Sequence, residues 1–287
     1  MQFITKSQNH IIYSLISSFL LLINGSTLFG QCGTIIPDAH KENPIIIQDQ
    51  NKGLIKNYLN KTLSVNVFVV ASDLNTYDFL LVDYKPLWDE LNEIFEPIGL
   101  SFELCFEQKI PNYNYNNDLV LGETENPNLL KDDEMFAQYY MDNVINVYYV
   151  ESIYAEELDG VGGYAYLPGG PDIIVLRKSS GIKTLVHEIG HFFGLYHTFE
   201  TSFGAELVNK NNCGEAGDLV CDTPADNNGE YSDGCVYLGP GTDANGDYYT
   251  PYLSNYMSYY GACVCRFTNG QYNRMAWNYL NIRNYLW

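Results

Sequence analysis

The sequence predicts a mixed α/β (α+β) fold, with a regular N-terminal half and an irregular C-terminal half that closes on a helix. Residues 62–72, 100–110 and 144–152 are short runs that alternate or are rich in Val and Tyr, as strands are. Helical spacing of apolar residues appears over 86–95. After Gly194 no periodic pattern is sustained until the end of the chain, which predicts a loop-rich region.

Pro86 opens the first predicted helix, because a proline at the first helical position costs no hydrogen bond. Pro97 and Gly99 end that helix before the strand over 100–110. The polar stretch 111–128 is then expected to be a long loop.

The strand over 144–152 precedes two further runs, 160–171 and 172–178, which suit short strands joined by a turn. A helical pattern starts at Gly181, and a second one covers 269–287 with its apolar residues on one face. The helix after Gly181 falls at the junction of the two halves, where we expect a cleft.

The N-terminus has the pattern of a secretory signal peptide. Lys6 and His10 precede the apolar run 11–23, which is too short to span a bilayer easily, and small and polar residues follow it. We expect cleavage after Gly30 and a secreted protein whose residues 31–60 form a leader before the domain. An uncleaved membrane anchor is the alternative, and no later segment has the length and apolarity to span a membrane.

The charge and the cysteines fit export. With 35 acidic against 15 basic side chains, the formal net charge is −20, which disfavours nucleic acid and anionic membrane surfaces as partners. Of seven cysteines, those at 213, 221, 235, 263 and 265 crowd into a stretch that disulfides would stabilise. The odd count leaves one thiol over.

The stretch HEIGHFFGLYH (187–197) indicates a metal site. His187 and His191 are four residues apart, so on a helix both imidazoles project from one face. Gly194 permits a sharp turn that brings His197 back toward the same ion. For the two histidines alone, a pair of satisfied surface side chains is the competing interpretation.

Three imidazoles with a fourth position open are typical of catalytic zinc, whereas structural sites are closed by four protein ligands. Such a zinc lowers the pKa of a bound water to about 7 and polarises a substrate carbonyl. Glu188 is then placed to take the proton of the water and pass it to the leaving amine.

The pattern HExxHxxGxxH is the signature of the metzincin metallopeptidases, and NYMSYY (255–260) resembles their Met-turn, with Met257 as the methionine. Within that group the chain resembles the pappalysin family, because GDLVCDTPAD (217–226) and CRFTNGQYNRM (265–275) follow in the same order. The resemblance covers roughly residues 60–287.

The resemblance implies a metzincin-type catalytic domain with a twisted, mostly parallel sheet, a backing helix and an active-site helix. The N-terminal catalytic subdomain would span 61–197, and a C-terminal subdomain with the Met-turn and the last helix would span 198–287. The three histidines would be the zinc ligands and Glu188 the general base.

The resemblance also assigns roles to other residues. Tyr259 matches a tyrosine that steadies the reaction intermediate, and the segment Gly163, Tyr164, Ala165 and Tyr166 matches the edge strand that pairs with an extended substrate. Calcium is the second expected metal, and its candidate ligands are Asp218, Asp222 and Thr223.

Two features depart from the family pattern. Some relatives prefer Arg or Lys after the scissile bond and carry an acid beyond the Met-turn, but YGACVC (260–265) has none. The cysteine arrangement also differs, and Cys235 paired with Cys263 or Cys265 is the expected bridge.

Cys32 is the candidate for the spare thiol. In QCGT (31–34) it resembles the cysteine switch of pappalysin precursors, in which a thiolate occupies the open zinc position. A disulfide from Cys32 to Cys105 or to the C-terminal cluster is the alternative. Release would require cleavage within 35–61, where the candidate sites are Lys41, Lys52, Lys56 and Lys61.

The sequence thus predicts a secreted zinc endopeptidase that acts on protein or peptide substrates and is made as a zymogen. The alternative is a catalytically silent binding module with the metzincin fold, although the intact Glu188 argues against it. Another zinc hydrolase, such as an amidase, is a third candidate that the Met-turn and the edge strand disfavour.

Overall fold

The computed structural model describes residues 31–45, 58–75, 84–121, 130–154 and 160–287. The predicted signal peptide lies outside the described residues, as do Lys52 and Lys56 of the leader. No helix within the described ranges is long and apolar enough to cross a membrane.

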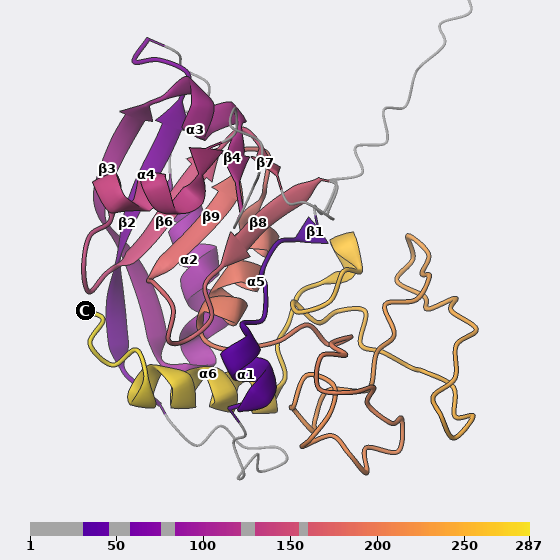
Figure 1. Cartoon of the computed structure of the whole chain (residues 1–287). Coiled ribbons are helices and arrows are strands. Elements are labelled where there is room, and N and C mark those ends of the chain that lie inside the picture. The colour runs from indigo at the N-terminus through magenta and orange to yellow at the C-terminus, as the bar shows by residue number, and fades with distance from the viewer. Residues whose placement is uncertain (1–30, 46–57, 76–83, 122–129, 155–159) are drawn as a thin grey trace, which may run out of the picture.

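A six-stranded sheet forms the frame of the molecule, in the order β1-β8-β9-β6-β2-β3 (Figure 1). All its neighbouring pairs are parallel except β8 with β9, which are antiparallel. The strands are β1 (Gln31–Cys32), β2 (Lys61–Ala71), β3 (Leu100–Pro111), β6 (Ile145–Val150), β8 (Val161–Ala165) and β9 (Ile173–Arg177). The predicted twisted, mostly parallel sheet is confirmed.

Helices cover both faces of this sheet, so its central strands are buried on both sides. Along β2, Val65 and Val67 join a core with α2 (Tyr84–Phe95), α5 (Ile182–Phe192) and α6 (Asn269–Asn281). Phe68 and Val70, which point the other way, pack with residues of α3 (Tyr113–Asn117) and α4 (Asp132–Tyr139). Figure 1 shows the two layers, with α5 and α6 on the side away from α4.

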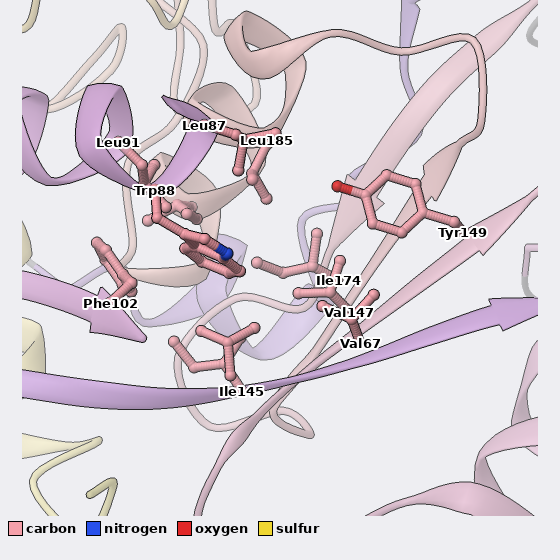
Figure 2. Close-up of a pocket in the computed structure, with 12 residues that line it drawn as sticks. Val67, Leu87, Trp88, Leu91, Phe102, Ile145, Val147, Tyr149, Ile174 and Leu185 are labelled. Carbon is pink, nitrogen blue, oxygen red and sulfur yellow. The ribbon is translucent and has the colours of Figure 1, made fainter. Parts of the chain in front are cut away.

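The core between the sheet and the helices α2, α5 and α6 holds α5 against the sheet. A narrow apolar pocket between α2, α5 and the strands is lined by side chains of all three, among them Trp88, Val147 and Leu185 (Figure 2). Ile189, one turn after Leu185, lines the same pocket. The apolar side of α5 therefore packs into the core, and the residues on its opposite side can contribute to a functional site.

Some element predictions were wrong. The polar stretch 111–128, expected as a loop, contains α3, which Asn112 caps by accepting a hydrogen bond from Tyr115 N at 3.1 Å, and β4 (Leu119–Val120). Strand β4 pairs with β5 (Leu130–Lys131) and β7 (Ile153–Tyr154) in a small parallel sheet. The terminal helix ends at Asn281 rather than at the last residue.

The terminal helix stops because the chain after it turns inward. Arg283 is fully buried and donates to the backbone oxygens of Phe192 (3.0 Å) and Tyr166 (2.9 Å), and it pairs with Asp172. A continued helix would carry this side chain away from those partners. The buried ion pair and its carbonyl partners thus override the helical pattern of the sequence.

Residues 198–268 are irregular, as predicted, with one short 3-10 helix at Gly261–Cys263. Two disulfides hold this region, Cys213–Cys221 and Cys235–Cys263, and the second is one of the two expected pairings. Cys32, Cys105 and Cys265 are free thiols. Cys32 is therefore not consumed by a disulfide here.

Candidate metal centre

Helix α5 presents two histidines on the side opposite its core contacts. His187 and His191 follow the pocket-lining Leu185 and Ile189 by two positions, which is about 200° around a helix. All four side chains are buried. The two histidines therefore face the irregular region rather than the sheet.

A tight turn after α5 returns the chain toward the same two histidines. Gly194 has φ +89°, and an added Cβ would collide with the side-chain amide of Asn278 on α6. The turn is closed by Gly194 N donating to His191 O at 2.7 Å and by Leu195 N donating to Gly190 O at 2.9 Å. Only glycine fits this position, and the turn delivers His197.

The three imidazoles converge at their Nε2 atoms. The Nε2 atom of His191 lies 3.1 Å from that of His187 and 3.1 Å from that of His197, and the remaining pair is 3.3 Å apart. Cys32 Sγ completes the cluster, whose four ligand atoms all lie within 4.8 Å of one another.

The opposite ring nitrogens fix the protonation of two of these rings. His187 Nδ1 donates to Tyr256 O at 2.6 Å, and His191 Nδ1 donates to Leu195 O at 2.8 Å, because a carbonyl can only accept. Both Nε2 atoms are thus bare lone pairs that face the centre of the cluster. Burial lowers the pKa of His187 to about 4, and burial also depresses the pKa of His191 and of His197.

Neutral lone pairs that converge repel one another unless a cation lies among them. Three imidazole nitrogens with a sulfur beside them form a donor set that suits zinc, which prefers nitrogen and sulfur ligands in tetrahedral geometry. The described residues therefore fit a zinc ion.

Met257, the candidate Met-turn methionine, lies against the helix that carries His187 and His191. It is fully buried, and a Cβ added at Gly190 would come within 2.5 Å of its Sδ atom. The turn itself is fixed by Met257 N donating to Asn255 Oδ1 at 2.9 Å. The next residue back, Tyr256, supplies the carbonyl that orients His187.

Glu188 is fully buried beside the cluster. Burial raises its pKa to about 8, so its proton can be taken up and released near neutral pH. Its Oε2 atom accepts hydrogen bonds from Thr34 Oγ1 at 3.3 Å and from Cys32 Sγ at 3.4 Å. A Cβ added at Gly163 would lie 3.2 Å from Glu188 Cγ, so β8 passes directly alongside.

Tyr259 also reaches the centre. Its ring meets that of His197 edge to face, with 4.9 Å between centroids. Its hydroxyl accepts from Cys32 N at 2.9 Å and donates to Cys32 O at 3.3 Å. Burial, with the neighbouring Cys32 as the second cause, raises the pKa of Tyr259, so the hydroxyl remains a donor.

The leader pairs with β8 as a two-residue strand. β1 runs parallel to β8, with Cys32 opposite Gly163, and Gly33 N donates to Gly163 O at 2.8 Å. Thr34 Oγ1 accepts from Ala165 N at 2.9 Å. Beyond it, α1 (Asp38–Glu42) places His40 3.1 Å from Pro168 O.

The four residues predicted to form the substrate edge divide between two faces of β8. Gly163 and Ala165 lie on the side of Glu188 and Thr34. Tyr164 and Tyr166 point to the other side, where their hydroxyls donate to Asp132 at 2.7 and 2.9 Å. Their side chains anchor the strand.

The calcium candidates are brought together only in part. Asp218 Oδ1 accepts from Thr223 Oγ1 at 3.0 Å, and both residues are buried. Asp222 is used elsewhere, because its carboxylate accepts from Thr268 Oγ1 and Gly270 N, each at 2.7 Å, at the start of α6.

Glu206 is an acid that sequence reasoning missed. It is buried against Gly217, and burial followed by the charge of Asp218 raises its pKa to about 8. Within the described part of the chain, neither oxygen of Glu206 has a hydrogen-bond partner, nor does Oδ2 of Asp218. Glu206 lies in an irregular stretch without a local motif, so nothing in its neighbours marks it.

Comparisons with known proteins agree with this geometry. The profile of the Peptidase M43 family, described as pregnancy-associated plasma protein-A, matches residues 174–280. An extracellular metalloprotease of Arthroderma gypseum is 39% identical over 266 residues, which cover 85% of this chain and 82% of that protein. An extracellular metalloprotease of Pyricularia oryzae is 32% identical over 235 residues, which cover 75% and 74%.

Among solved structures, Tannerella forsythia mature mirolysin in complex with a cleaved peptide covers 75% of this chain and 89% of its own, with a TM-score of 0.44 and 19% identity. The sequence relatives carry the assignment. The chain is a metalloendopeptidase that belongs to the pappalysin family of the metzincins, and the relatives that it matches are extracellular.

Proposed function

We propose that this protein is a zinc-dependent endopeptidase in which His187, His191 and His197 hold the metal and Glu188 moves the proton. The observation that carries the proposal is the convergence of three Nε2 atoms, 3.1 to 3.3 Å apart, with two of the rings held in the ligating tautomer by backbone carbonyls. Metal-binding histidines usually donate their other ring N–H to an oxygen such as a backbone carbonyl.

Bound zinc would supply Lewis acidity, polarising the substrate carbonyl and making water nucleophilic near pH 7. Glu188 would take the proton of the attacking water and return it to the leaving nitrogen, a role that suits a buried carboxyl beside the three histidines. Tyr259 donates its hydroxyl to the negative charge that develops on the substrate oxygen.

A peptide substrate would lie along β8 in the position that the leader now holds. There the backbone of Gly163 and Ala165 already bonds to Gly33 and Thr34. Pairing through the main chain accepts many sequences and leaves selectivity to side-chain pockets.

The leader would keep the enzyme latent by blocking each working group at once. Cys32 occupies the fourth position beside the three histidines, its backbone holds the Tyr259 hydroxyl, and Thr34 bonds to Glu188. The cut that releases it must precede Leu59 and Lys61, because their N–H groups bond to Ile98 O and Gly99 O in the folded domain.

The activity is tested by casein hydrolysis with the full chain carrying Cys32→Ala, beside the same chain carrying Glu188→Gln as well. The Glu188→Gln chain should retain its zinc and lose activity by about 10²- to 10⁴-fold, the usual contribution of a positioned acid–base group. If neither chain cuts even after the leader is cleaved, while both retain zinc, the catalytically silent binding module replaces the enzyme.

Latency is tested by comparing the intact chain with its Cys32→Ala variant before any cleavage. The variant should be active and the parent silent. Cys105→Ala, which removes another free thiol at an exposed position, should stay as silent as the parent. A silent Cys32→Ala chain that becomes active on cleavage would show that the Cys32 thiol is not what keeps the precursor inactive.

We also propose a calcium site at Glu206, Asp218 and Thr223. Buried carboxylate oxygens without partners are the hard ligands that Ca²⁺ prefers. Calcium should raise the melting temperature of the native chain but not that of Glu206→Gln. Asp243→Asn is the matched control, because the carboxylate of Asp243 already accepts from Val208 N, Asn245 N and Asp247 N. An unchanged calcium response in Glu206→Gln would refute the site.

A further inference from the structure

His197 differs from the other two histidines in how it is held. His187 and His191 each donate Nδ1–H to a backbone carbonyl, but no Nδ1 partner of His197 is found in the part of the chain that the structure describes. The ring of His197 is stacked on Phe199, at 4.8 Å and 5°. Its orientation is set by contacts with the rings of Phe199, Tyr259 and His187 and by its backbone, which lies outside any helix or strand.

The residue after His197 is held by a buried carboxylate and by a backbone hydrogen bond. Thr198, the next residue, donates its hydroxyl to Asp226 Oδ2 at 2.7 Å and its N–H to Met257 O at 3.0 Å. Thr198 is 4% exposed and Asp226 is 9% exposed. The hydrogen bonds are thus shielded from competing water.

The same carboxylate holds the residue next to Tyr259. Tyr260 is fully buried and donates its hydroxyl to Asp226 Oδ1 at 2.6 Å, while Asn228 N donates to that oxygen at 2.8 Å. Both oxygens of Asp226 are therefore used, unlike those of Glu206. Asp226 acts as an acceptor within the protein and stays outside the proposed calcium set.

We propose that Asp226 is a positioning residue that fixes two parts of the catalytic centre relative to each other: the third histidine, through Thr198, and the tyrosine Tyr259, through Tyr260. The inference rests on the proposed zinc peptidase function. The two segments come from different parts of the irregular region, and neither belongs to an element whose backbone ladder would set its place. Instead, one carboxylate joins the two segments by accepting a short hydrogen bond from a hydroxyl of each.

The two arms of Asp226 predict two different losses. The Thr198 arm orients a metal ligand, so its removal should weaken zinc binding. The Tyr260 arm orients a group that acts on the developing charge, so its removal should lower kcat and leave KM and zinc affinity alone. A residue with a merely structural role would lower the melting temperature without separating these quantities.

The test uses the full chain with Cys32→Ala as the common background, so that only the three histidines hold zinc. Thr198→Val and Tyr260→Phe each delete one hydroxyl and keep the shape of the side chain. Tyr237→Phe is the control, because its hydroxyl bonds at 2.6 Å to Asn227, the immediate neighbour of Asp226. Zinc dissociation constants, kcat, KM and melting temperatures are measured for all four chains.

Thr198→Val should raise the zinc dissociation constant by about 10- to 100-fold, the range for residues that orient metal ligands. Tyr260→Phe should lower kcat at least about 10-fold with KM and zinc affinity within about twofold of the parent. Asp226→Ala should combine both losses, and the two single-hydroxyl variants decide the question if that chain does not fold.

Unchanged zinc affinity in Thr198→Val, or unchanged kcat in Tyr260→Phe, would overturn the proposal. So would a Tyr237→Phe control that loses as much kcat as Tyr260→Phe, because loop stability alone would then explain both. A parent chain that holds zinc but cuts no peptide refutes the proposed activity instead, and the zinc affinity of Thr198→Val still decides the role of Asp226.

Discussion

Two regions of this chain build one centre by different physical means. Residues 58–197 are positioned by a backbone ladder and an apolar core, and they supply His187, Glu188 and His191 on a helix. Residues 198–268 have almost no regular structure, yet they bring Tyr259 into contact with His197 and place Met257 against Gly190 of the same helix. Regular structure is evidently not needed to place a catalytic group.

The irregular region compensates with buried polar side chains and disulfides. Asp218, Asp226, Asn255 and Ser258 are all buried there, and each bonds to a backbone or side-chain group. Backbone groups that lack a ladder must find such partners. Substitutions in the regular region should therefore destabilise the protein by creating cavities. Substitutions in the irregular region should do so by removing disulfides or hydrogen bonds or by disturbing turns.

The largest expected loss is in the regular core. Phe95 is fully buried and packs edge to face with Phe102 at 5.2 Å. Phe95→Ala should lower the free energy of unfolding by about 3 to 5 kcal/mol, measured by urea denaturation. Phe106→Ala, at a ring that is 41% exposed, should cost less than about 1 kcal/mol. Equal losses of unfolding free energy would mean that the apolar core is not what stabilises this region.

Removing a disulfide tests the irregular region. The chain-entropy relation gives about 3.6 kcal/mol for the bridge Cys235–Cys263, with a sequence separation of 28, and about 2.6 kcal/mol for Cys213–Cys221, with a separation of 8. Paired Cys→Ser variants in urea would measure both. A larger loss from the shorter loop would show that native packing, and not loop closure, stabilises the region.

Gly194 lies in the turn that joins the two regions, and Gly194→Ala should lower the free energy of unfolding by about 3 kcal/mol. The left-handed φ and the crowded Cβ both oppose the change. Gly204→Ala is the matched control. It has φ +98°, but its nearest neighbour is Ala216 Cβ at 3.8 Å, so only the backbone cost of about 1 to 2 kcal/mol applies. Similar losses of unfolding free energy in the two variants would show that the close contact with Asn278 adds no cost.

The smallest effect concerns pH and the anchor of β8. Burial raises the pKa of Asp132 above its ordinary value of about 3.9, so the folded chain binds this proton more tightly than the unfolded chain. Its contribution to stability is complete below that ordinary value and is lost as the pH rises through the raised, folded pKa. Asp132→Asn should flatten this fall in unfolding free energy, and an unchanged slope would contradict the assignment.

Sequence patterns predicted the parts that depend on local spacing. The elements predicted in this way are the strands β2, β3, β6, β8 and β9, the helices α2 and α5 and the closing helix, which follow from alternation, helical periodicity and Pro or Gly at their ends. The convergence of the histidines followed from the spacing of His187 and His191 and from the glycine at position 194.

The partners that meet only in the fold were not predictable. Thr34 and Asp226 make contacts with residues far along the chain. They end the motifs QCGT and GDLVCDTPAD, but these motifs name no partner for them, and Glu206 lies in no motif. The same holds for Arg283, whose buried bonds end α6 where the helical pattern continues. Local sequence reports periodicity, whereas these groups are defined by tertiary contacts.

The account stands or falls on one metal centre that is assembled from both regions and closed by the leader. The most direct measurement is the zinc X-ray absorption spectrum of the intact chain beside its Cys32→Ala variant. The account predicts three imidazole nitrogens and one sulfur in the intact chain, with the sulfur replaced by a light atom in the variant. A spectrum without sulfur in the intact chain, or with fewer than three imidazoles in both, would contradict it.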